Sequence, residues 1–294
     1  MAFRSPLPPL RSETPRKECH DSAMKTKSLS AFVLLLLATC VFAQVQPPAK
    51  KLLVIGEVKG FEHDSVSHAM ATIEKLGRQT GLWDTYIRTD AELLTKAKLG
   101  NNAKNLNYFD AVMFYTTGDL GLTDQQKADL LSFVRDDGKG FLGTHSATDT
   151  YYNWPEYGDL IGAYFNEHPW MQVHCVIRTE DKEFPATAHF PDRFPFYDEI
   201  YQFKAPYSRD KLRVLMSVDP DSVDLTNPRV HRTDRDFAVT WVHNYGKGRV
   251  FYSSLGHRDE VWDMPDIQKM WIEAVKWVMG MTAGDATPRP LAAH

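Results

Sequence analysis

The apolar positions of this chain alternate between short unbroken runs and stretches with helical spacing. The run at 52–56 contains no alternating polar residues, which is typical of a strand in a parallel sheet covered on both faces. Apolar residues in 67–80 then recur every three or four positions, and Gly81 ends this segment. The pattern predicts a buried strand followed by an amphipathic helix.

The same unit recurs further along the chain. A second buried strand is predicted at 110–116 and a second helix at 123–137, where Thr123 and Gln126 have the spacing of a capping box. A third short strand is predicted at 140–144. Strands that alternate with helices in this way predict right-handed crossovers and a doubly wound, mostly parallel α/β sheet with helices on both faces.

The second half of the chain has a less regular pattern. Residues 151–235 are rich in aromatic residues, prolines and histidines, and strands are predicted at 172–178 and 212–218. Two apolar runs around the glycine-rich connection 244–248 predict a β-hairpin. A closing helix is predicted at 265–279, because a proline suits its first turn and its apolar residues form one stripe.

This pattern divides the chain into four parts. A leader is predicted at 1–43, a spacer at 44–50, and one domain at 51–281, without internal repeats or a second apolar core. The tail at 282–294 is rich in proline and alanine, and we expect it to be frayed and flexible.

The leader has the order of parts that a secretory signal requires. Lys25 and Lys27 precede the apolar run 31–37, and small residues lead to a cleavage site after Ala43. The run is too short to span a bilayer, so the mature chain is expected to have no transmembrane span. We therefore expect an exported protein, periplasmic or secreted.

Two features of the leader leave alternatives open. Met24 immediately precedes the signal and is the expected start of translation, although 1–23 could also be a genuine disordered leader. Residues 37–40 loosely resemble a lipoprotein signal ending at Cys40, but threonine is unusual before such a cysteine, so cleavage after Ala43 is favoured.

Composition narrows the class of protein. The 294 residues include 34 basic and 38 acidic side chains, 43% hydrophobic and 24% charged residues, which excludes whole-chain disorder and a multi-span membrane protein. The slight acidity argues against a nucleic-acid partner. Without 1–43, the remaining 251 residues carry a formal charge of −7 and one cysteine, Cys175, so they can form no intrachain disulfide.

Candidate chemistry gathers directly after the predicted strands, where open α/β sheets bind ligands. The segments there are 60–64 (GFEHD), 117–119 (TGD), 145–146 (HS) and 256–260 (GHRDE). Each histidine alone could be a structural or surface residue. Three histidines, His63, His145 and His257, at equivalent strand ends favour either acid/base chemistry or a metal site.

His145 has the most specific context of the three. It follows a short strand and lies in a turn of small residues, 143–147, which is typical of a nucleophile elbow whose side chain and backbone N–H groups face a pocket. In the structural alternative, the small residues only allow the chain to turn. We favour a functional role.

Several of these segments together resemble the ThuA-like (trehalose-utilisation) family over about 50–280. They are KLLV at 51–54, FEHD at 61–64, GFLGTHSA at 140–147, FNEHP at 165–169, and GRVFY at 248–252 followed by Gly256 and His257. The resemblance implies a class I glutamine amidotransferase-like, flavodoxin-type fold and a link to the catabolism of disaccharides, particularly 3-keto sugars.

The chain departs from the wider superfamily at the nucleophile. The resemblance implies a cysteine at the elbow, where this chain has His145, and a late pair that falls on His257 and Asp259. Cys175 lies on a different predicted strand, so thiolate-based glutamine hydrolysis is disfavoured. Ser146 is an alternative nucleophile, but it lies one residue further along the turn and points elsewhere.

We predict His145 and His257 as acid/base residues, with Asp259 orienting His257. The predicted substrate-binding residues are His63, Asp119, Ser146, His168, Glu199 and Trp170. The alternatives are a solvated strand-end acid for Glu199 and a core position for the aromatic residues.

A metal site is a further prediction from these residue types. No cofactor is required by the sequence, but three histidines with a carboxylate could hold Zn²⁺ with an open position for water. Short paired-ligand spacing is absent, since His63 and His68 are five positions apart, so the ligands would have to converge from separate loops.

Three functions remain open from the sequence. The leading one is an exported enzyme with a small-molecule carbohydrate substrate, which could act by hydrolysis, isomerisation or β-elimination beside a keto group. The others are a non-catalytic sugar-binding module and a zinc-dependent hydrolase of another small molecule. A homo-oligomer is compatible with each of them.

Overall fold

A computed structural model describes residues 48–101 and 103–291 of the chain. The predicted signal peptide at 1–43, the start at Met24 and the lipid-attachment alternative at Cys40 lie outside the described residues. Among the residues that are described, no helix is long and apolar enough to cross a membrane.

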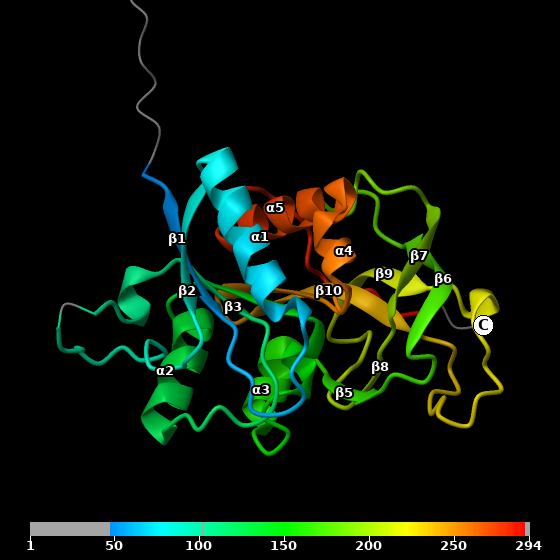
Figure 1. Cartoon of the computed structure of the whole chain (residues 1–294), viewed down its shortest axis with the longest axis horizontal. Helices are drawn as coiled ribbons and strands as arrows, with labels where there is room; N and C mark the ends of the chain where they lie inside the picture. The colour runs from blue at the N-terminus through cyan, green and yellow to red at the C-terminus, as the bar shows by residue number, and fades with distance from the viewer. Residues whose placement is uncertain (1–47, 102, 292–294) are drawn as a thin grey trace, which may run out of the picture. The chain divides into compact units, whose positions relative to one another are not determined.

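One half of the central nine-stranded sheet is parallel (Figure 1). Its strands are arranged in the order β2-β1-β3-β4-β11. Their bounds are Trp83–Arg88, Lys50–Ile55, Ala111–Phe114, Gly140–Thr144 and Gly248–Ser253 in that order. This is the flavodoxin-type strand order, so the doubly wound fold predicted from the sequence is confirmed.

The other half of the sheet is antiparallel and continues from β11. Its strands follow in the order β10-β9-β6-β7, with bounds Ala238–Tyr245, Arg213–Val218, Gln172–Thr179 and Arg193–Glu199. A separate two-stranded sheet pairs β5 (Tyr164–Glu167) with β8 (Gln202–Lys204). The antiparallel half brings the end of β7 to the same edge as the ends of the parallel strands.

Helices cover both faces of the parallel half. The helices α1 (Ser65–Thr80), α4 (Asp259–Asp263) and α5 (Pro265–Val278) lie on one face, and α2 (Asp124–Arg135) and α3 (Pro155–Ile161) lie on the other (Figure 1). Three short 3₁₀ helices complete the described part of the chain, at Leu106–Tyr108, His145–Asp149 and Pro220–Ser222.

Strand β1 shows why an unbroken apolar run forms this architecture. Leu52 and Val54 pack into the core beneath α1 and α5, whereas Leu53 and Ile55 pack into the core beneath α2 and α3. Successive side chains of a strand point to opposite faces, so a strand with two covered faces needs apolar residues at every position.

The elements predicted from apolar runs and helical spacing are present within a few residues. The predicted capping box is also present, since Thr123 accepts from the backbone of Gln126 and the Gln126 side chain accepts from the backbone of Thr123. The hairpin connection is shorter than expected, because β10 continues to Tyr245 and leaves only Gly246 and Lys247 as the turn.

The tail that we expected to be frayed makes specific contacts in the described part. Asp285 forms a 2.6 Å ion pair with Arg213, and the Arg289 side chain donates to the carbonyl oxygen of Glu180 at 2.8 Å. Ala286 is buried. The proline-rich composition therefore marks a segment without helix or strand that packs on the end of β9.

Candidate functional site

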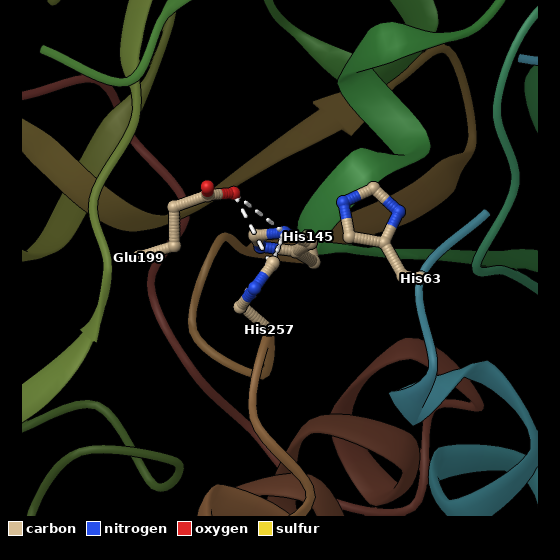
Figure 2. A group of neighbouring side chains, drawn as sticks. All are labelled: His63, His145, Glu199 and His257. Carbon is tan, nitrogen blue, oxygen red and sulfur yellow. Dashed lines mark hydrogen bonds and ion pairs between the residues drawn. The ribbon is translucent and has the colours of Figure 1, made fainter. Parts of the chain in front are cut away.

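Four side chains from four separate elements converge at the carboxyl edge of the sheet. His63 lies between β1 and α1, His145 follows β4, Glu199 ends β7, and His257 follows β11. One nitrogen or oxygen atom of each lies within 4.8 Å of those of the other three. We call this group the His-Glu cluster (Figure 2).

The turn at His145 is sharp. His145 has a φ of 42°, a backbone region that residues other than glycine rarely adopt, directly after the extended Thr144. The Tyr252 hydroxyl donates to the His145 carbonyl oxygen at 2.7 Å. The elbow-like turn predicted from small residues is present, and it aims a histidine into the cluster.

The hydrogen-bond partner of one ring nitrogen shows that this nitrogen of His145 carries a hydrogen. Nδ1 lies 2.7 Å from the carbonyl oxygen of Ser254, which can only accept, so Nδ1 carries the hydrogen. The other ring nitrogen, Nε2, faces the cluster, where the Tyr201 hydroxyl lies 2.8 Å away. A backbone carbonyl behind one imidazole nitrogen is the usual support of a metal-ligating histidine.

Glu199 lies between His145 and His257. Its Oε2 atom is 3.4 Å from His145 Nε2 and 3.2 Å from His257 Nδ1, and these two nitrogens are 3.3 Å apart. Burial would raise the pKa of Glu199, but the two imidazoles outweigh it and hold this pKa well below its usual range. Burial lowers the pKa of His257, but the hydrogen bond to Glu199 prevails and raises it.

His63 supplies the fourth group. Its side chain is buried, and its ring lies edge-on to His145 at 4.7 Å and to His257 at 5.4 Å between centroids. Among the described residues, Nδ1 has no hydrogen-bond partner. Burial, followed by the neighbouring imidazoles, lowers the pKa of His63 to about 3, so the ring is neutral and able to donate a lone pair.

The loop that carries His257 is fixed through Gly256. The Gly256 N–H donates to Asp198 at 2.7 Å, and its carbonyl oxygen accepts from Ser65, Tyr115 and Trp262, each at 3.0 Å. Gly256 has a φ of 131°, a region open mainly to glycine. Asp198 is fully buried, so the end of β7 both supplies Glu199 and anchors the His257 loop.

Asp259 does not have the role that its sequence position suggested. It is an exposed residue in the first turn of α4, and the carboxylate in contact with His257 is Glu199. The acid two residues along the chain lies in the first turn of a helix, whereas the acid from a distant strand reaches the imidazole.

The other predicted site residues lie at varying distances from the cluster. Asp119 accepts from the Gly121 N–H in the loop after β3, and Ser146 is buried in the turn after His145. Trp170 donates to the Asp224 carbonyl oxygen at 2.7 Å and does not belong to the cluster. His168 is near it only through Tyr201, at 6.4 Å between ring centroids.

Sequence reasoning gave no role to Asp198 and considered Tyr201 only as one of several aromatic residues that could hold a sugar. Asp198 and Tyr201 flank Glu199 within the segment 197–201, which carries two acids among aromatic residues. Tyr201 is buried and touches both His145 and His63 through its hydroxyl. The sequence did offer a signal for these residues. The end of this strand mixes acidic and aromatic residues, whereas a buried structural strand would be apolar throughout.

A cavity of about 270 Å³ opens onto the cluster at His63 and His257. We call it the entry pocket. It is lined by residues of the β1–α1 loop, the start of β6 and the loop before α4: Phe61, Glu62, His63, Asp64, Ser65, Gln172, His257, Arg258, Asp259 and Glu260. The cluster is therefore reachable by a small molecule.

Comparison with solved structures shows the same fold in two other proteins. A ThuA-like protein from Bacteroides uniformis ATCC 8492 has a TM-score of 0.62 at 21% identity, over 79% of this chain and 92% of that one. A ThuA-like protein from Parabacteroides merdae ATCC 43184 has a TM-score of 0.62 at 16% identity, over 83% and 98%. A search of curated proteins finds no significant match.

The sequence itself matches a family model over nearly the whole described domain. Residues 51–278 match the ThuA model, whose description is trehalose utilisation. This range runs from β1 to the end of α5 and includes all four residues of the His-Glu cluster. The chain therefore belongs to the ThuA family.

Proposed function

We propose that this protein is a metal-dependent enzyme that acts on a sugar during disaccharide breakdown, with the His-Glu cluster as its active site. The observation that carries the proposal is the set of three distances among His145 Nε2, His257 Nδ1 and Glu199 Oε2, which are 3.2 to 3.4 Å. Ligands at about 2.0 to 2.1 Å from a tetrahedral ion are separated by roughly 3.3 to 3.4 Å.

The donor set fits a divalent first-row ion such as Zn²⁺. Imidazole nitrogens and one carboxylate are ligands that this class of ion accepts, and His63 supplies the third imidazole and the fourth ligand. The Ser254 carbonyl holds His145 in the tautomer that a ligand needs. When bound, such an ion would polarise a carbonyl oxygen, for example that of a 3-keto sugar.

Two lines of support give the substrate and the class of chemistry. The family description, trehalose utilisation, supplies the sugar. Cys175 argues against a thiolate mechanism, because it lies within β6, is buried, and has a pKa raised to about 12 by burial. Glutamine hydrolysis through a cysteine is therefore not part of the proposal.

A metal-free acid/base site is the second candidate, and one observation favours it. The pKa of His257 is raised and that of Glu199 is lowered, as in a buried ion pair. A protonated His257 could then donate its proton to a leaving sugar oxygen while a second group removes a proton from the carbon beside the keto group.

One experiment separates these functions. Purified protein is analysed for metal content and assayed with 3-keto-trehalose before and after chelation, together with His145→Ala. The proposal expects about one metal ion per chain, turnover lost on chelation and restored by Zn²⁺, and none in His145→Ala. Turnover that survives chelation would support the metal-free site, and sugar binding without turnover in any form would support a binding module.

Export is the remaining part of the proposal. The lysines, apolar run and small residues that precede Gln44 support cleavage after Ala43. Expression of the full chain in a bacterium with a periplasm, followed by fractionation and mass determination, tests it. A mature chain that begins at Gln44 is expected, whereas an uncleaved cytoplasmic chain would contradict export.

A further inference from the structure

Uncompensated negative charge surrounds the entry pocket. Among the described residues, Glu62, Asp64 and Asp259 form no ion pair, and all three are exposed. The one cationic side chain in the lining, Arg258, is already engaged, since it pairs with Glu260 at 2.9 Å and donates to Gln172 at 3.0 Å. The outer part of a ligand in this pocket therefore meets three carboxylates and, among the residues that the structure describes, no free lysine or arginine side chain.

The groups at the floor of the pocket do not cancel this charge. No lysine or arginine of the described chain lies there, since the floor is formed by His63 and His257, with Glu199 Oε2 at 3.2 Å from His257 Nδ1. An ion held by the His-Glu cluster would act on the part of a ligand that reaches the floor. The three carboxylates act on the outer part.

Phe61 gives the rim an apolar face. Its side chain is 65% exposed, and its ring lies edge-on to His63 at 4.8 Å between centroids. The backbone beneath it is fixed, because Thr117 accepts from the Gly60 N–H at 3.1 Å and donates to the Phe61 carbonyl oxygen at 3.0 Å. A large exposed aromatic ring on an anchored loop is a ready platform for the C–H face of a sugar.

His63 connects the rim to the floor. Its side chain is only 6% exposed and lines the pocket. Its Nδ1 atom has no hydrogen-bond partner within the described part of the chain. Hydroxyl groups of a bound sugar can donate to the three carboxylates, which only accept. The cavity of about 270 Å³ suits one sugar ring with its substituents more closely than a whole disaccharide.

We propose that the entry pocket is a subsite for one uncharged sugar ring stacked on Phe61, and that Glu62, Asp64 and Asp259 reject phosphorylated and carboxylated sugars. This inference rests on the proposed action on sugars and goes further by naming the charge class of the substrate. Like charges in contact across an interface are strongly unfavourable, and each pair at partly exposed positions contributes about a fivefold discrimination.

The test measures binding of two probes to the metal-loaded full-length protein by calorimetry. Trehalose is the neutral probe and trehalose 6-phosphate is the anionic one. We expect trehalose to bind at least about tenfold more tightly at low salt, with a smaller ratio at 0.5 M salt because the carboxylates are exposed. The triple variant Glu62→Gln/Asp64→Asn/Asp259→Asn should bring the ratio close to one.

Two further variants sharpen the result. Phe61→Ala should weaken both probes by a similar factor of about two to ten, since it removes stacking and no charge. Glu92→Gln, an exposed acid outside the pocket, is the matched control and should leave the ratio unchanged.

The outcomes separate this inference from the function on which it rests. Equal binding of the two probes to the wild-type protein, or a ratio that the triple variant does not alter, overturns the charge selection while leaving action on sugars intact. Failure of both probes to bind, with metal and fold retained, overturns the sugar subsite and the proposed function together.

Discussion

His145 donates its Nδ1 hydrogen to the backbone carbonyl oxygen of Ser254 at 2.7 Å, across two neighbouring parallel strands. Ser254 immediately follows β11, which pairs with β4, so the sheet register itself positions this acceptor. No side-chain substitution at 254 removes a backbone carbonyl. The Nε2 atom of His145 therefore faces the cluster as a consequence of the fold.

Glu199→Gln should weaken metal binding. The substitution keeps the shape of the side chain but removes the charge beside two imidazoles, and we expect the dissociation constant for Zn²⁺ to rise at least about tenfold. Titration with Zn²⁺ in competition with a chromophoric chelator measures it. His174→Ala, an exposed histidine that stacks on Tyr197 outside the cluster, is the control. Equal affinity in Glu199→Gln and wild type would remove Glu199 from the ligand set.

Gly256→Ala should destabilise the protein and reduce activity together. A Cβ at this position would lie 2.9 Å from Trp262 Nε1, and its φ of 131° strains any other residue, so we expect a loss of about 2 to 4 kcal/mol in unfolding free energy. Urea denaturation measures the loss. Gly280→Ala is the matched control, because Gly280 also has a positive φ but open space around it. A similar loss in both variants would show that backbone strain alone, rather than contact with Trp262, is responsible.

Cys175 should be dispensable for activity. Its thiol is buried in β6 and its pKa is raised to about 12 by burial, so very little thiolate exists at neutral pH. We expect Cys175→Ala to keep kcat/KM on a keto sugar within about twofold and the native protein to react slowly with iodoacetamide. Rapid inactivation by the reagent, prevented by substrate, would contradict this expectation.

The sequence was most informative where one face of a strand or helix is continuously apolar. β1, β3 and β4 were predictable because both faces are buried, and the histidines after them followed from the rule that strand ends meet at one edge. β2 was not predicted, because it lies at the edge of the sheet and most of its side chains are partly or fully exposed.

The choice between Asp259 and Glu199 could not be made from the sequence. Proximity along the chain favoured Asp259 as the partner of His257, but a helix starts there and leaves the side chain exposed. Glu199 reaches the cluster only because β7 extends the antiparallel half of the sheet, and its pairing depends on contacts between distant segments. The local sequence pattern was therefore enough to identify the histidines, but their carboxylate partner depends on the tertiary structure.

The stability of the fold should fall between about pH 6.5 and pH 4 because of His243, which lies on β10 away from the His-Glu cluster. Its ring is buried and donates from Nε2 to the Leu160 carbonyl oxygen at 2.9 Å. Burial lowers its pKa from an ordinary value of about 6.5 to about 4, although the backbone carbonyls and Asp159 act in the opposite direction.

The sign of this effect follows from proton binding. Below pH 6.5 the unfolded chain binds a proton at His243 that the folded chain does not, so stability is fully present above about 6.5 and falls until the folded pKa of about 4 is passed. The shift corresponds to about 3 kcal/mol at the low end of this window. His243→Gln keeps a donor for Leu160 but cannot titrate, so its unfolding free energy, measured by urea denaturation at half-unit pH steps, should decline less steeply than that of the wild type. Parallel profiles for the two proteins across this window would show that other groups cause the decline.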